Sequence, residues 1–147
     1  MCRSSQGFWQ VASTSYTING KTHERSGNTT ILDTGTTLLL VDDTVLQTIY
    51  GPYCVSSGLR FPHVHFPDAI EGAVYDDQQG GWKYPSNAKI PDVSFAVGDT
   101  LYKLNATDFG FGPADEGFTF GGIQSRGDLD FDIFGDVFLK SVYVVCE

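Results

Sequence analysis

The chain contains the stretch Ile31-Leu32-Asp33-Thr34-Gly35-Thr36-Thr37, a short polar turn between two apolar segments. The apolar flanks carry Asp33 toward the interior, where a carboxylate must accept hydrogen bonds or become protonated. Gly35 allows the backbone to turn an N–H group toward this carboxylate, and Thr36 offers a hydroxyl group. The pattern therefore indicates a carboxylate held by its own turn. The alternative is a plain strand connection, in which Asp33 only satisfies backbone amides.

The segments beside this turn predict a strand and a helix. Residues 29–32 are Thr, Thr, Ile and Leu, which favour a strand before the turn. After the turn, an apolar run leads into residues 42–50, whose apolar positions fall on one helical face. Either Asp42 or Asp43 can cap this helix, and both favour its positive N-terminus. Gly51-Pro52 is expected to end it.

The rest of the chain has the composition and the turn residues of an all-β fold. Charged residues make up 18% of the chain and aromatic residues 14%, and there are 17 glycines. Few charges with many glycines and aromatics are typical of strands joined by tight turns. Hairpin turns are predicted at Asn19-Gly20 and Gly98-Asp99. Strands are expected within residues 8–18, 93–97, 101–104, 117–123 and 142–145.

A late stretch alternates apolar and acidic residues. Its apolar members are Leu129, Phe131 and Ile133, and its acidic members are Asp128, Asp130 and Asp132. Such alternation predicts a half-buried strand with an acidic face in solvent. A calcium site on that face is a weaker interpretation of the same residues.

Length and charge exclude several classes of protein. The 147 residues suffice for one domain, and the 41% hydrophobic content excludes a disordered chain. The net charge of −9 argues against nucleic acid as a partner, and no apolar run is long enough to span a membrane. The start of the chain has no apolar region typical of a signal peptide. Two glycosylation sequons are present, at Asn28 and Asn105.

Several blocks of sequence together resemble the C-terminal lobe of the fungal pepsin-like aspartic proteases, peptidase family A1. The blocks are Gly7-Phe8-Trp9-Gln10, Asp33-Thr34-Gly35-Thr36-Thr37-Leu38-Leu39, Gly80-Gly81-Trp82, Ile90-Pro91-Asp92-Val93, Gly121-Gly122-Ile123-Gln124 and Ile133-Phe134-Gly135-Asp136-Val137-Phe138-Leu139-Lys140. The resemblance implies that residues 1–147 form a single all-β lobe, half of a bilobal protease, with twisted packed sheets and one or two short helices. It implies a secreted or vacuolar protein.

The resemblance also implies a role for each residue of the motif. The implied activity is endopeptidase cleavage of a protein or peptide substrate by a water that an aspartate dyad activates, with no cofactor and no metal. Asp33 would be the catalytic residue of this lobe. Four residues would support the active site, namely Thr34, Gly35, Thr36 and Gly135. Three would bind substrate, namely Ile31, Thr37 and Ile133.

One departure from the family limits the expected activity. The sequence holds a single Asp-Thr-Gly, at Asp33, whereas the dyad needs two aspartates. A monomer is therefore expected to be inactive, and an N-terminal lobe or a second copy would complete the dyad. The alternative is a non-catalytic fragment or pseudoenzyme lobe that acts at most as a peptide-binding β domain.

Other departures concern the integrity of the lobe. An unmatched insertion spans about residues 52–68, and the C-terminus is expected to be truncated relative to the family. Reading of an unspliced intron would explain the insertion. Pro85 and Thr119 are expected at the positions of the family's disulfide. Cys2, Cys54 and Cys146 are too few and too scattered for a disulfide scaffold, although the sequence allows one disulfide bond. His63 and His65 would share one face of a strand with Asp68 and Glu71 nearby, a spacing compatible with a zinc site, but the segment has no pattern that favours one.

Overall fold

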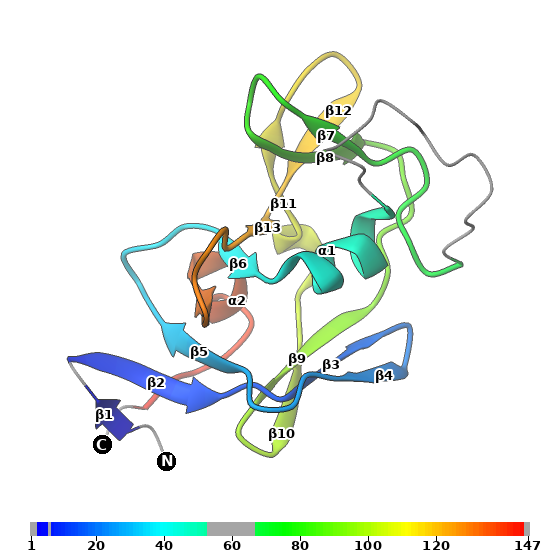
Figure 1. Cartoon of the computed structure of the whole chain (residues 1–147). Helices are drawn as coiled ribbons and strands as arrows, with labels where there is room; N and C mark the ends of the chain where they lie inside the picture. The colour runs from blue at the N-terminus through cyan, green and yellow to red at the C-terminus, as the bar shows by residue number, and fades with distance from the viewer. Residues whose placement is uncertain (1–2, 6, 53–66, 146–147) are drawn as a thin grey trace.

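The computed structural model describes residues 3–5, 7–52 and 67–145, and for residues 3–5 only the backbone. These residues form three sheets, two α-helices and one 3-10 helix (Figure 1). The all-β class with short helices is confirmed. Most of the 52–68 insertion, both histidines of the zinc interpretation and all three cysteines lie outside the described residues.

A six-stranded sheet carries the Asp33 motif, in the strand order β1-β2-β5-β14-β6-β13. Its strands are β1 (Arg3–Ser5), β2 (Phe8–Ala12), β5 (Thr29–Leu32), β6 (Leu39–Val41), β13 (Ile123–Ser125) and β14 (Asp132–Phe134). The central strand β14 runs parallel to β5 and antiparallel to β6. The residues just before and just after the predicted turn are therefore both anchored to one short strand.

Two four-stranded sheets complete the β structure. One has the order β10-β9-β3-β4, from β3 (Ser15–Ile18), β4 (Lys21–Glu24), β9 (Val93–Val97) and β10 (Thr100–Lys103). The other has the order β11-β12-β8-β7, from β7 (Val74–Asp76), β8 (Gly81–Pro85), β11 (Gly110–Pro113) and β12 (Phe118–Gly121). Both predicted hairpins are confirmed, because β3 pairs with β4 and β9 with β10 across the expected turns. The 3-10 helix η1 (Ala106–Asp108) follows β10.

Helix α1 (Asp43–Tyr50) lies between the two four-stranded sheets in Figure 1. Asp42 caps it, since one carboxylate oxygen accepts hydrogen bonds from the Thr44 and Val45 N–H groups, and Gly51 ends it with a φ of 95°. The buried ring of Tyr50 stacks on Trp82 of β8, with ring centroids 5.2 Å apart. The helix thus joins the sheets through one apolar core, and its predicted position is confirmed. Helix α2 (Asp136–Leu139) is a single turn after β14.

The strand predicted at residues 142–145 is wrong. These residues follow α2 as a bend and irregular backbone, and Tyr143 is 94% exposed. A strand needs a neighbour for its N–H and C=O groups, and no described strand pairs with this segment. The composition of residues 142–145 alone therefore does not predict their structure.

The acidic face predicted near the end of the chain is also wrong in part. Strand β14 covers only residues 132–134, and the Asp132 side chain is fully buried. Its Oδ2 atom accepts hydrogen bonds from Arg25 Nη1 at 2.6 Å and Asn28 Nδ2 at 3.0 Å. Its Oδ1 atom accepts one from Arg126 Nη1 at 2.7 Å. The guanidinium groups of Arg25, distant in sequence, and of Arg126, six residues away, therefore hold this carboxylate inside, whereas Asp128 and Asp130 stay exposed.

Replacing Asp132 with Ala is expected to lower the free energy of unfolding by about 3–5 kcal/mol, because removal of one partner leaves buried charges uncompensated. The Arg25 side chain is only 8% exposed and lies over the rings of Tyr16 and Phe95. Urea unfolding at one fixed pH measures the loss. The exposed Asp130→Ala is the matched control, with an expected change within about 0.5 kcal/mol. Equal stabilities of the two variants would contradict a buried charge cluster.

Thr119, one of the two residues expected at the positions of the family's disulfide, forms a hydrogen bond with Ser86, the residue after Pro85. In the pairing of β8 with β12, Pro85 lies opposite Phe118 and Thr119 lies opposite Tyr84. The Thr119 hydroxyl oxygen is 2.8 Å from that of Ser86, just past the end of β8, so these two hydroxyls share a hydrogen bond. A hydroxyl pair therefore links these two segments, and the correspondence of Pro85 and Thr119 to the family's disulfide stays a prediction.

Candidate functional site

Asp33 follows directly on β5, next to the central strand of the six-stranded sheet. Its backbone N–H donates a hydrogen bond to the Phe134 carbonyl oxygen at 3.1 Å, which extends the parallel β5–β14 pairing by one residue. The preceding pairs run from Thr30 opposite Asp132 to Leu32 opposite Phe134. This pairing fixes where the turn leaves the sheet and thus where the carboxylate lies.

Both carboxylate oxygens of Asp33 accept hydrogen bonds from the turn itself. The Gly35 N–H donates to Oδ1 at 2.9 Å, and the Thr36 hydroxyl donates to Oδ2 at 2.6 Å. These are the two contacts that the sequence predicts. The Thr36 bond, and after it the Gly35 bond, hold the pKa of the Asp33 carboxyl below its ordinary value, against a small effect of burial. The half-buried group therefore favours the ionised form.

Gly135 lies directly against the Asp33 turn. A Cβ atom at this position would fall closer than 3.0 Å to the carbonyl oxygens of Thr36 and Leu38. The segment after Gly135 also bonds to the turn, because the Asp136 N–H donates to the Thr36 carbonyl at 2.8 Å and the Val137 N–H to the Thr37 carbonyl at 3.1 Å. The predicted close passage of the two segments is present, and only glycine fits it.

The remaining predicted residues surround the turn. Ile31 and Ile133 are register partners on β5 and β14; Ile31 is buried and Ile133 half-buried. Thr34 and Thr37 are exposed. All eight residues named from the sequence thus lie on β5, the turn, β14 or its end. Their catalytic and binding roles stay predictions.

Sequence reasoning missed Phe134, whose carbonyl anchors Asp33 and whose fully buried ring packs against Phe95 and Phe138. Its part in the site is played by a backbone atom, which any residue would supply, so the side chain carries no signal of it. Its position in the sequence could have indicated it, since Phe134 directly precedes Gly135, which contacts the turn.

The comparison with protein families settles the relationship. The model of the family described as "Eukaryotic aspartyl protease" matches residues 2–147. The chain belongs to this family. Among curated relatives, it is 41% identical over 143 residues to aspergillopepsin-1 of Aspergillus pseudoglaucus and equally identical to aspergillopepsin-1 of Aspergillus oryzae. It is 36% identical over 144 residues to penicillopepsin-1 of Penicillium janthinellum.

These alignments cover nearly all of this chain but a minor part of each relative. They include 97% of the chain, against 32% of either aspergillopepsin-1 and 39% of penicillopepsin-1. The aspartyl protease domain described above therefore corresponds to about a third of the aspergillopepsins. The activity of the full-length relatives is therefore only a proposal for this chain.

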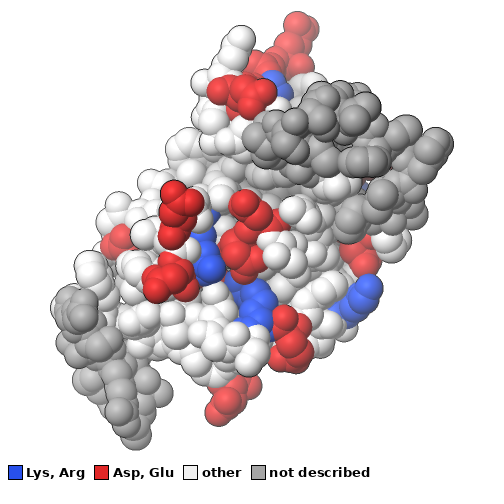
Figure 2. Space-filling view, viewed as in Figure 1, with Lys and Arg blue, Asp and Glu red and all other residues white. Residues whose placement is uncertain are grey.

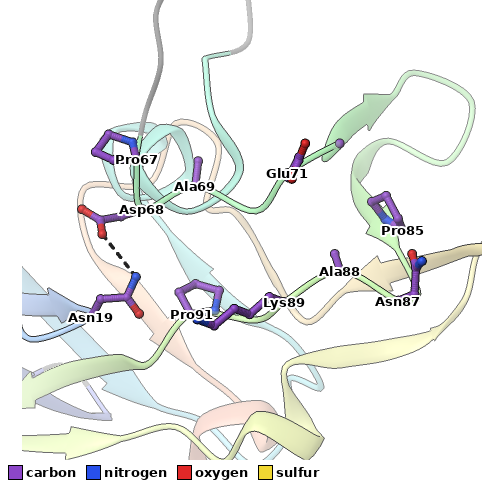
Figure 3. Close-up of a pocket in the computed structure, with 11 residues that line it drawn as sticks. Asn19, Pro67, Asp68, Ala69, Glu71, Pro85, Asn87, Ala88, Lys89 and Pro91 are labelled. Carbon is purple, nitrogen blue, oxygen red and sulfur yellow. Dashed lines mark hydrogen bonds between the residues drawn. The ribbon is translucent and has the colours of Figure 1, made fainter.

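A depression of this aspartyl protease domain lies away from the Asp33 turn. It has a volume of about 530 Å³ and is lined by residues of the β3–β4 turn and of the segments 67–72 and 85–91 (Figure 3). The Asn19 side chain donates a hydrogen bond to Asp68 at its rim, at 3.2 Å. None of the predicted site residues lines it.

Charge on the visible face is mixed. Figure 2 shows basic side chains in small groups that acidic side chains border, without a continuous basic surface on that face. Within the described residues, no helix is both long and apolar enough to cross a bilayer. No group of at least three potential metal-binding side chains occurs in that same part of the chain.

Replacing Thr36 with Val is expected to raise the pKa of Asp33 toward its ordinary value, because the largest cause of the lowering is lost. A carboxyl whose pKa is lowered by folding stabilises the fold above its unfolded pKa, and this contribution is lost as the pH falls through the folded pKa. The variant should therefore lose less stability on acidification than the parent. An NMR titration of the Asp33 carboxyl measures the midpoint. Thr37→Val, with an exposed side chain, is the control, and equal midpoints in the two variants would contradict the assignment.

Proposed function

We propose that this chain supplies Asp33 as one of the two catalytic aspartates of an aspartic endopeptidase, and that it corresponds to the C-terminal lobe. The observation that carries the proposal is the Asp33 carboxylate, which accepts a hydrogen bond on each oxygen from its own turn. Membership of the aspartyl protease family supports the same reading. The turn presents an ionised carboxylate at the end of β5, an inner strand of the six-stranded sheet, as a base that activates water requires.

A second aspartate would complete the chemistry. Two facing carboxylates share one proton, because both cannot ionise at close range. The ionised member would take a proton from the attacking water while the protonated member donates a hydrogen bond to the scissile carbonyl oxygen. In the described residues, no charged group contributes to the lowered pKa of Asp33. We infer that the partner carboxylate comes from an N-terminal lobe or, less simply, from a second copy of this chain.

The proposed substrate is a protein or peptide in an extended conformation. Ile31 and Ile133 would form an apolar wall beside the scissile bond, since they are register partners on adjacent strands. The exposed Thr37 would contact the substrate backbone, and the exposed Thr34 would bond across to the partner's aspartate loop. Gly135, which has no Cβ atom, would let the Asp33 turn pack directly against the end of β14. A secreted or vacuolar location fits a protease that works in acid.

A non-catalytic role is the second candidate, and the single Asp-Thr-Gly of the chain favours it. With its pKa lowered by the hydrogen bonds from Thr36 and Gly35, Asp33 alone offers a base but no proton donor. In this case the lobe would bind peptides at most, along the edge that Thr34 and Thr37 occupy.

Reconstitution distinguishes the two candidates. The chain is assayed for peptide cleavage at acid pH by itself over a wide concentration range, and then mixed with the remaining part of aspergillopepsin-1 from Aspergillus pseudoglaucus. Size-exclusion chromatography with light scattering records the assembly in the same samples. We expect no cleavage by the monomer and cleavage in the fraction that contains the complex. A complex that forms and cleaves nothing would favour the non-catalytic lobe, and cleavage by the monomer would contradict the dyad.

A further inference from the structure

The two glycosylation sequons differ sharply in their surroundings. In the sequon at Asn28, the amide nitrogen donates to the Ser13 carbonyl at 3.1 Å and to Asp132 at 3.0 Å, and the amide oxygen accepts from Arg126 at 2.8 Å. The hydroxyl residue of this sequon, Thr30, is fully buried and bonded to backbone carbonyls. Every polar atom of the Asn28 amide is therefore engaged in the buried charge cluster, which leaves no place for a sugar.

The sequon at Asn105 is presented to solvent. Asn105, Ala106 and Thr107 are all exposed. The Asn105 side-chain oxygen accepts a hydrogen bond from the Thr107 N–H at 3.3 Å, which caps η1. Among the described residues, nothing accepts a hydrogen bond from the Asn105 amide nitrogen. The backbone is held, because the Asn105 N–H donates to the Ser141 hydroxyl at 2.9 Å. The free nitrogen thus projects from a fixed position.

We propose that Asn105 is an N-glycan acceptor and that Asn28 is not. The donor is an oligosaccharide linked to a lipid diphosphate. The Asn105 amide nitrogen forms a bond to the anomeric carbon of the first sugar and loses one proton to a base of the transferase. The bond between that carbon and the diphosphate oxygen breaks, and the lipid diphosphate leaves with the electron pair. A glycan on Asn28 would replace one of the two N–H groups that bond to Asp132 and the Ser13 carbonyl, and it would be incompatible with the fold.

The position of Asn105 suits a bulky polar substituent. Asn105 lies two residues after the end of β10, an edge strand of its sheet whose Leu101 and Tyr102 side chains are 45% and 39% exposed. Exposed edge strands with apolar residues invite pairing between molecules. A glycan at the end of β10 would cover this edge with hydrophilic, surface-solubilising mass.

The test is site mapping on the full chain, produced in yeast behind a secretion leader. Peptide N-glycosidase in heavy-oxygen water labels each asparagine that carried a glycan, and mass spectrometry then reads the Asn105 and Asn28 peptides. We expect label on Asn105 only. The glycosidase-sensitive mobility shift should vanish in Asn105→Gln and Thr107→Ala and persist in the conservative Thr107→Ser. An unlabelled Asn105 peptide, or any label on Asn28, would overturn the proposal.

Discussion

Replacing Asp33 with Asn is expected to lower kcat/KM of the assembled protease, meaning this chain with the partner that supplies the second aspartate, by roughly 10³–10⁴-fold. The change keeps the shape of the side chain but removes its ability to accept a proton from water, and a positioned general base contributes up to about 10⁴-fold. This loss corresponds to about 4–5.5 kcal/mol of transition-state stabilisation. Peptide cleavage at acid pH, normalised to the amount of complex, measures it.

The matched control for this variant is Asp99→Asn. Asp99 is an exposed aspartate in the β9–β10 turn and belongs to none of the contacts of the Asp33 turn. The control should retain full activity, and both variants should assemble like the parent. Activity of Asp33→Asn equal to that of the control would show that Asp33 takes no part in the chemistry.

Replacing Gly135 with Ala is expected to lower the free energy of unfolding by about 3 kcal/mol, at the upper end of the cost of overpacking. The φ of −84° at Gly135 suits any residue, so the cost is a collision and not a strained backbone. The added methyl group would meet the carbonyl oxygens of Thr36 and Leu38. The hydrogen bonds that the Asp136 and Val137 N–H groups donate to the Asp33 turn oppose any separation.

Thermal unfolding of the chain measures this effect, with an expected fall in Tm of roughly 6–12 °C for a domain of this size. Gly112→Ala is the control, because a Cβ atom there would meet nothing within 4 Å and φ is not positive. A Gly135→Ala protein as stable as the Gly112→Ala protein would mean that the turn and β14 are not in close contact. In the assembled protease, the same substitution should also reduce activity, because it displaces the turn that holds Asp33.

The local parts of the site were predictable because their causes are local. The Asp33 turn, the Asp42 cap of α1 and the two hairpins each depend on residues within a few positions of one another. A glycine or a hydroxyl at a fixed offset decides such features. The close contact of Gly135 with the Asp33 turn joins segments about a hundred residues apart in sequence, and only the resemblance to a known family indicated it.

The features that sequence reasoning got wrong depend on distant partners. Asp132 has the same alternating pattern as Asp130, but Asp132 forms ion pairs with Arg25, which is distant in sequence, and with the nearer Arg126, and is buried. Residues 142–145 have the composition of a strand, but whether they pair depends on a neighbour that composition does not reveal.

The central claim is that Asp33 forms half of a proton-sharing dyad, and an NMR titration of its carboxyl carbon tests this most directly. In the chain alone, the Thr36 and Gly35 hydrogen bonds hold the pKa of Asp33 below its ordinary value. After assembly with the remaining part of aspergillopepsin-1, a facing carboxylate should produce two coupled titration steps, the later one above the midpoint of the chain alone. A complex that forms while Asp33 keeps a single, unshifted midpoint would contradict the account.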